Sequence, residues 1–164
     1  MSHPKIIGAA EAIIFEDHAG CAPQRLCFPG MSSCISITGD VPGSMVGAHV
    51  TAHTPDEELN GMMRQMGEMG GINCTALYVV GPIGRYQEEW PQRSRSVIAN
   101  LIRDKLKTDA RVRFYMTPPN VHIFAEREGP LLRFFHCPDS LARIPPYPAG
   151  IARTEIQPGQ FVVR

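Results

Sequence analysis

Short apolar runs of strand length recur along the chain, bounded by glycine, proline, asparagine and aspartate, a pattern typical of β-strands joined by tight turns. The Val-Pro-Gly sequence at 41–43 and the Thr-Pro-Pro-Asn sequence at 117–120 predict two such turns. The expected strands span residues 10–15, 25–28, 35–38, 45–51, 75–80, 111–116, 121–125, 131–136, 151–156 and 161–163.

Two other segments have the period of a helix. The first begins with Thr54 as the expected N-cap, Pro55 at the first helical position and Glu57 completing a capping box, and it ends at 70–71, a pair of glycines. A second helix is expected over 91–107, after a loop at 81–86. The apolar residues expected to face the core are Leu59, Met62, Met63, Met66 and Met69 in the first helix and Val97, Ile98, Leu101, Ile102 and Leu106 in the second.

These elements together predict an α/β fold, a layered sandwich of mainly antiparallel, mixed β-sheet with two principal helices. The chain has 164 residues, of which 43% are hydrophobic and 20% charged, so we expect residues 1–164 to form a single folded domain. The proline-rich stretch 137–150 is expected to wrap the domain surface, and Pro-Pro-Tyr-Pro at 145–148 is an alternative polyproline recognition segment.

Charge and hydropathy restrict the class of partner. Sixteen basic and sixteen acidic residues balance, so no net field would gather nucleic acid or an anionic membrane. The apolar pieces at 6–7 and 12–15 are too short for a membrane span or a signal peptide. We therefore expect a protein made in the cytoplasm, with no nucleic-acid or membrane partner. One group of charges is expected to form a solvated helical face: Arg85, Arg93, Arg95 and Arg103 with Glu88, Glu89 and Asp104.

Five cysteines without close pairing make a poor disulfide framework. Cys74 and Cys137 lie in strand-like runs, where cysteine behaves as a small buried hydrophobe. Cys34 differs because it follows Gly30, Ser32 and Ser33, which permit a sharp turn and leave backbone N–H groups available to a ligand.

The region around Cys34 also supplies a base. His49 lies in the second of two strand-like runs joined by the 41–43 turn, so an antiparallel pair could bring its imidazole beside the Cys34 thiol. A thiol becomes an effective nucleophile when a neighbouring base takes its proton. The two residues therefore predict a thiol hydrolase or transferase.

The order of Cys34, a β run, a turn, Gly47-Ala48-His49, a capped helix, a buried strand, a glycine-containing loop and a second helix resembles the CheD family of chemoreceptor glutamine deamidases. It is also similar to the catalytic domain of the cytotoxic necrotizing factors and related bacterial deamidase effectors. The resemblance covers roughly 25–107 and implies hydrolysis of a glutamine side chain on a protein partner. It implies no cofactor, and a protein that acts in the cytoplasm or is delivered into another cell without a cleaved signal peptide.

The resemblance also implies residue roles. Cys34 would be held as a thiolate by His49 and attack the carboxamide, and the backbone N–H groups of Ser33 and Cys34 would stabilise the oxyanion. The chain has no threonine before the cysteine loop to orient His49, so we expect a backbone carbonyl near Phe28 to do so, as in the toxin group. Three further residues could form a substrate-binding surface: Arg85, Tyr86 and Trp90.

Alternative functions remain open at this point. Cys27, Cys34, His49 and His53 could instead form a zinc site. The domain could also be a non-catalytic interaction module, with Arg85, Tyr86 and Trp90 as an interface anchor. Finally, the same Cys-His pair could catalyse transglutamination or peptide-bond cleavage.

Overall fold

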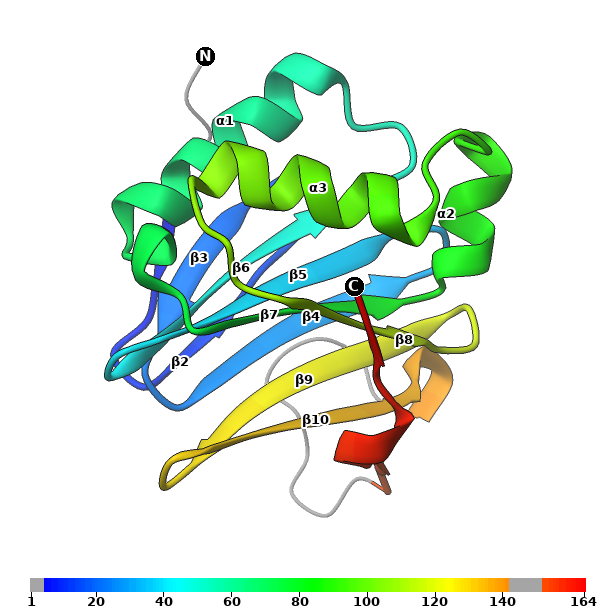
Figure 1. Ribbon diagram of the computed structural model, residues 1–164. Helices are drawn as coiled ribbons and strands as arrows, with labels where there is room; N and C mark the ends of the chain where they lie inside the picture. Colours follow the sequence, from blue (N-terminus) through cyan, green and yellow to red (C-terminus); the bar gives the residue numbers. More distant parts are fainter. Residues whose placement is uncertain (1–4, 142–151) are drawn as a thin grey trace.

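The computed structural model describes residues 5–141 and 152–164, so the 145–148 segment and the start of the strand expected at 151 lie outside the described residues. Two mostly antiparallel β-sheets form layers (Figure 1). The larger has the order β1 (Lys5–Ile7), β3 (Ala19–Ala22), β6 (Ser44–Val50), β5 (Ile35–Val41), β7 (Ala76–Gly81), β8 (Val112–Met116) and β12 (Val162–Val163). The smaller has the order β11 (Thr154–Ile156), β10 (Leu131–Pro138), β9 (Val121–Glu128), β4 (Arg25–Met31) and β2 (Glu11–Ile13). The predicted layered α/β sandwich is confirmed.

Helices cover the outer face of the seven-stranded sheet, where Figure 1 shows α1 (Asp56–Glu68) and α3 (Arg95–Leu106) side by side. The shorter α2 (Ile83–Glu89) lies between β7 and α3 in the chain, and single 3₁₀ turns occur at Gly71–Asn73, Asp139–Leu141 and Pro158–Gln160. The methionine stripe of α1 is buried as expected at Leu59, Met62, Met63 and Met66, with Met69 packed at its edge. Gly70, at φ +108°, follows the end of α1 as predicted.

Alternation along the strands creates two main cores. The helix-side core lies between the seven-stranded sheet and the helices, and contains Ile35, Ala48 and Val50. The inter-sheet core lies between the two sheets, and contains Leu26, Phe28 and Cys34. Each core excludes a large apolar area from water, which is the main stabilising term for such a fold.

Three local expectations were wrong. Thr54 does not cap α1, because its hydroxyl accepts the Thr51 N–H and donates to Asp17 Oδ1 at 2.6 Å, and Pro55 stands at the N-cap. The segment expected to be a loop at 81–86 contains most of α2, since Pro82 immediately precedes the helix, where proline is well tolerated. Val97 is 43% exposed, because the stripe of α3 that faces the core runs through Ile98, Ile102 and Leu106.

Two short strands, β1 and β3, were not predicted from the sequence. The sequence of β3 is Ala-Gly-Cys-Ala, which has no β-branched or aromatic residue to mark it. Its small residues have a packing reason, because a Cβ at Gly20 would lie 2.8 Å from the carbonyl oxygen of Ile6 on β1. The close approach of the two strands therefore requires glycine there.

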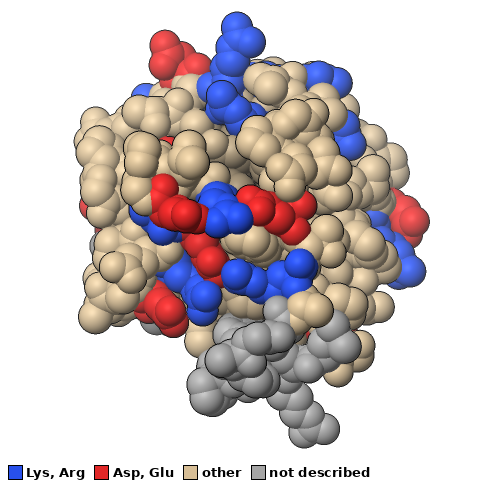
Figure 2. All heavy atoms as spheres, turned by 90° about the horizontal axis from the view of Figure 1, so that it is seen from below, with Lys and Arg blue, Asp and Glu red and all other residues tan. Residues whose placement is uncertain are grey.

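The surface carries intermingled charges. Figure 2, seen from below, shows Lys and Arg next to Asp and Glu across one face of the molecule. Ion pairs on the five-stranded sheet include Arg25 with Glu126 at 2.9 Å and Arg133 with Glu155 at 2.6 Å. Among the residues that the structure describes, no helix combines the length and apolar character needed to cross a bilayer.

Candidate functional site

Cys34 lies where the chain passes from one sheet to the other. β4 belongs to the five-stranded sheet and β5 to the seven-stranded sheet, so residues 32–34 form the crossover between them. Just before it, the register of β4 shifts between Phe28 and Met31, and Gly30 adopts φ +63°. The bend directs the Cys34 side chain into the inter-sheet core, where the residue is only 2% exposed. The thiol therefore does not lie at an open surface.

His49 faces the same core from the end of β6. Its neighbours Ala48 and Val50 point into the helix-side core, so strand alternation turns the imidazole to the opposite side. The ring is fully buried, and its Nδ1–H donates to the carbonyl oxygen of Ile14 at 2.9 Å. Nε2 has no hydrogen-bond partner among the described residues. The imidazole is thus held in one tautomer with a single free nitrogen.

Glu16 completes the cluster from a second crossover. Residues 14–18 connect β2 of the smaller sheet to β3 of the larger one, at the same end of the sandwich as residues 32–34. A carboxylate oxygen of Glu16, the sulfur of Cys34 and a ring nitrogen of His49 all lie within 4.8 Å of one another. Because Nδ1 is hydrogen-bonded to the Ile14 carbonyl, Nε2 is the ring nitrogen that can still accept a proton or bind a ligand.

Backbone contacts hold this second crossover against β6. The Asp17 N–H donates to the His49 carbonyl at 2.9 Å, and the His49 N–H donates to the His18 carbonyl at 3.1 Å. Asp17 adopts φ +62°, a left-handed conformation that aspartate tolerates better than most residues. Glu16 itself remains exposed, so a charged group lies at the surface above a buried thiol and imidazole.

A third segment supports the cysteine from β7. Gly81 ends that strand at φ +153°, and a Cβ built there would lie 2.8 Å from the carbonyl oxygen of Cys34. The backbone of β7 therefore approaches the backbone of Cys34 more closely than any residue with a side chain would permit.

The environment of Cys34 keeps its thiol protonated. Burial raises the pKa of Cys34 to about 11, and the negative charge of Glu16 adds to the rise, while hydrogen bonds from the backbone at Ser33 and Ser32 oppose it. The expected thiolate is therefore not the resting form.

Burial likewise lowers the pKa of His49 below its ordinary value of 6.5, and its hydrogen bond to Ile14 opposes that shift. At neutral pH the site thus holds a neutral thiol beside a neutral imidazole, with the proton still on sulfur. Such a pair can transfer that proton only as charge develops during a reaction.

The residue that orients His49 differs from the one expected. The acceptor of the Nδ1–H is the Ile14 carbonyl, whereas Phe28 contributes its ring, which contacts His49 edge-on with centroids 6.3 Å apart. A backbone carbonyl does orient His49 as predicted, but it belongs to Ile14 and not to a residue near Phe28. β2 runs parallel beside β4, and the residue that follows β2, Ile14, reaches the imidazole.

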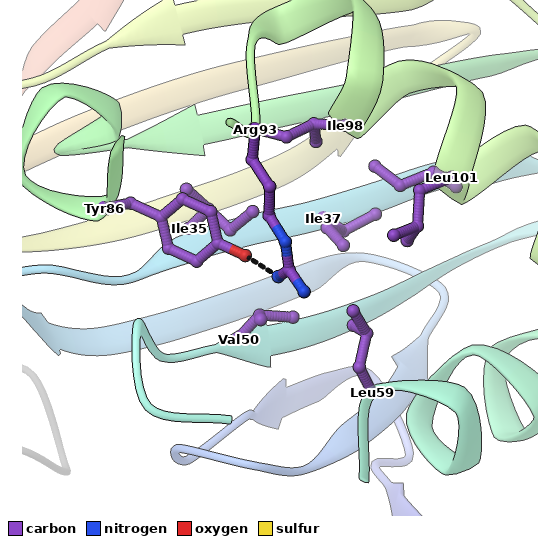
Figure 3. Close-up of a pocket in the computed structure, with 9 residues that line it drawn as sticks. Ile35, Ile37, Val50, Leu59, Tyr86, Arg93, Ile98 and Leu101 are labelled. Atoms are coloured by element: carbon purple, nitrogen blue, oxygen red, sulfur yellow. Dashed lines mark hydrogen bonds between the residues drawn. The ribbon is translucent and has the colours of Figure 1, made fainter. Parts of the chain in front are cut away.

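The expected substrate-binding residues do not form one surface at the site. Tyr86 is buried in the helix-side core, and Figure 3 shows its hydroxyl beside the Arg93 guanidinium, which donates to it at 2.6 Å. Trp90 packs at the edge of the same core and donates to the Ala52 carbonyl at 2.5 Å. This core lies on the opposite face of the sheet from Cys34, so Tyr86 and Trp90 cannot line the thiol, and only Arg85 is exposed.

Arg93 likewise departs from the predicted solvated helical face. It is 8% exposed, its guanidinium lies 4.4 Å from the centre of the Trp90 ring, and it donates to Asp56 Oδ1 at 2.8 Å. The charge is thus paired and hydrogen-bonded, as burial of an arginine requires.

The expected zinc ligands do not come together. Cys27 packs with Phe124 and Cys137 on the far face of the five-stranded sheet, and His53 is exposed. Cys34 and His49 do lie together, and Glu16 joins them in place of the other two. Cys74 and Cys137 are buried with free thiols, which fits the packing role predicted for them.

Sequence reasoning missed Glu16, Ile14 and Gly81. Glu16 and Ile14 belong to a crossover whose position depends on how the sheets stack, and a single acidic residue after an apolar run does not reveal that. Gly81 had a weak signal, since a glycine before proline at a strand end is typical of a special backbone conformation.

Comparison with known proteins adds no family to this description, because neither a protein-family model nor a curated protein matches the sequence.

Proposed function

We propose that this protein is a thiol-dependent amidohydrolase that deamidates a glutamine side chain of a protein substrate. One observation carries the proposal: the Cys34 sulfur and a His49 ring nitrogen lie within 4.8 Å, while the Ile14 carbonyl fixes Nδ1 and leaves Nε2 unpartnered. An imidazole oriented by a third group and directed at a thiol is the arrangement that nucleophilic catalysis requires.

In the proposed reaction, the Cys34 sulfur attacks the carboxamide carbon as its proton moves to His49 Nε2. The negative charge on the carbonyl oxygen is stabilised by the backbone N–H groups of Ser33 and Cys34. The carbon–nitrogen bond then breaks, the leaving nitrogen takes the proton from His49, and ammonia departs from a thioester. His49 next accepts a proton from water, and the hydroxide attacks the thioester carbon. The carbon–sulfur bond breaks as His49 returns that proton to sulfur, and the carboxylic acid that is released loses its proton to solvent.

The closed resting site fits a requirement for substrate-induced opening. A thiol that is 2% exposed cannot meet a protein side chain until residues 32–34 or the exposed Glu16 move aside. Removing Glu16 from its position next to Cys34 would also remove one of the two main causes of the high pKa of the thiol. Binding of a cationic neighbour of the glutamine to Glu16 would have both effects.

The decisive experiment measures ammonia release together with the change of a glutamine to a glutamate by peptide mass spectrometry, with casein as the first probe. Wild-type protein should convert glutamines, and Cys34→Ser should not. Cys74→Ser is the matched control, since that thiol is also buried but lies in the helix-side core. Equal conversion by wild type and Cys34→Ser would contradict the proposal.

Other products distinguish the related reactions. Incorporation of an added primary amine in place of water would indicate transglutamination, and backbone cleavage would indicate proteolysis by the same pair. A wild-type protein inactive toward casein and toward a library of glutamine peptides flanked by lysine or arginine would favour the non-catalytic interaction domain.

A further inference from the structure

The cluster of Glu16, Cys34 and His49 has the composition of a metal-binding site. It presents one carboxylate, one sulfur and one ring nitrogen, all within 4.8 Å of one another. Of these residues, His49 is completely buried, and its Nε2 has no partner among the described residues. A buried polar nitrogen that lacks a hydrogen bond is costly, and a bound ligand would remove that cost.

We propose that Glu16, Cys34 and His49 bind one zinc-class divalent cation, and that the bound cation prevents Cys34 from acting as a nucleophile. The binding stands independently of the proposed amidohydrolase activity, whereas the inhibition rests on it.

The chemistry of the three ligands selects the cation. Sulfur and imidazole are preferred by zinc and its neighbours, whereas calcium and magnesium prefer sites made only of oxygen. When the cation binds, the S–H bond of Cys34 breaks, the sulfur–metal bond forms and one proton passes to solvent. The thiolate and the Glu16 carboxylate then carry two negative charges, which balance the charge of the cation beside two buried side chains, Cys34 and His49.

The geometry needs only a small contraction. Zinc–ligand bonds of about 2.0–2.3 Å in a tetrahedron place the ligand atoms about 3.3–3.8 Å apart. The observed separations are at most 4.8 Å, so shifts of about 1 Å suffice. Glu16 is exposed and can supply most of the movement, while His49 stays on its strand.

The support behind the histidine has the form found at metal centres. A metal-bound histidine usually donates its other ring N–H to a carbonyl or carboxylate, which fixes the ring and its tautomer. His49 already does so, since its Nδ1–H donates to Ile14 at 2.9 Å. Three protein ligands would leave a fourth position for water, and the sulfur would no longer be free to attack a carboxamide.

The test uses the full-length protein after treatment with a chelator. Zinc is titrated by calorimetry, and cobalt is added separately to detect the charge-transfer absorption of a cobalt–thiolate bond. We expect one zinc per chain and a cobalt–thiolate band in wild type, and loss of the band in Cys34→Ser. Glu16→Gln changes only an exposed residue, so it should fold normally and bind zinc at least tenfold more weakly. The matched controls are Cys74→Ser and Glu57→Gln, which should bind like wild type.

The outcomes separate the two proposals. Zinc binding that is unchanged in both Cys34→Ser and Glu16→Gln, or absent from wild type, would overturn the metal site whatever the activity. Site-specific binding by a protein that deamidates nothing would retain the metal site and overturn its inhibitory role. Deamidation that continues at saturating zinc would likewise overturn the inhibition while leaving the proposed function intact.

Discussion

Replacing Gly81 with alanine tests the architecture that supports Cys34. The new Cβ would lie 2.8 Å from the Cys34 carbonyl oxygen, and the obstacle is backbone, which cannot rotate away as a side chain can. The residue also has φ +153°, where a side chain adds strain. Such strain costs about 1–3 kcal/mol and overpacking costs a similar amount, so Gly81→Ala should lower the free energy of unfolding by about 2–4 kcal/mol.

Gly43→Ala is the matched control. Gly43 has φ +72° in the turn between β5 and β6, and a Cβ there would meet nothing within 4 Å. Gly43→Ala therefore measures only the strain of a side chain at positive φ, which should lower the free energy of unfolding by about 1–2 kcal/mol. Urea unfolding followed by Trp90 fluorescence gives both free energies.

The substitution at Gly81 should also change the thiol. Displacing the Cys34 carbonyl moves the crossover that covers the sulfur, so iodoacetamide should alkylate Cys34 faster in Gly81→Ala than in wild type, and deamidation should fall. Gly43→Ala should leave both rates unchanged. If the two variants lose equal stability and Cys34 reacts as in wild type in both, the close approach of β7 to Cys34 does not support the site as we describe it.

Three further predictions concern the buried polar groups and the tight packing around the site. Tyr86→Phe removes one of the two side-chain acceptors of the Arg93 guanidinium, the other being Asp56. It should destabilise the fold by about 1–3 kcal/mol in urea unfolding, and an unchanged midpoint would contradict this. Burial lowers the pKa of both His49 and His136, so the unfolded chain binds protons more readily than the folded protein. The free energy of unfolding should therefore be constant above pH 6.5 and fall as the pH drops below it. A free energy of unfolding that does not change between pH 7.5 and pH 5 would contradict this. Gly47→Ala would place a Cβ 2.8 Å from the Phe28 ring and should cost about 1–3 kcal/mol by the same urea assay. A free energy of unfolding equal to that of wild type would contradict the tight packing of that ring.

Sequence periodicity could predict the layers because each strand and helix carries its own pattern. The apolar stripe of α1 and the strand runs of β5 and β6 are local features, and the turn at 41–43 fixes the antiparallel pairing that joins them. The pairing of Ser36 with His49 follows from that turn, so Cys34 and His49 could be predicted to lie near each other. Local patterns failed where small residues make a strand, as in β3.

The face of the sheet against which a side chain packs was harder to predict than the position of a strand in the sequence. Tyr86 and Trp90 follow β7 directly in the chain, which made them plausible neighbours of a site at that end. The side on which α2 packs depends on tertiary contacts, and those contacts place both aromatic residues with the helices. The prediction for Arg93 was wrong for a related reason. Arg93 lies in the loop before α3, and its partners Tyr86 and Asp56 come from α2 and α1, so its burial depends on how the helices pack together.

The origin of the three site residues explains how a closed site could still react. His49 belongs to β6, whose ladder with β5 holds its backbone in place. Cys34 and Glu16 belong instead to the two crossovers between the sheets, and neither lies in a strand. Movement of a crossover can therefore expose the sulfur without breaking a strand ladder, and local openings of this kind cost less free energy than global unfolding. The same freedom allows Glu16 to approach a cation or to turn toward a substrate, so these two events would compete for one carboxylate.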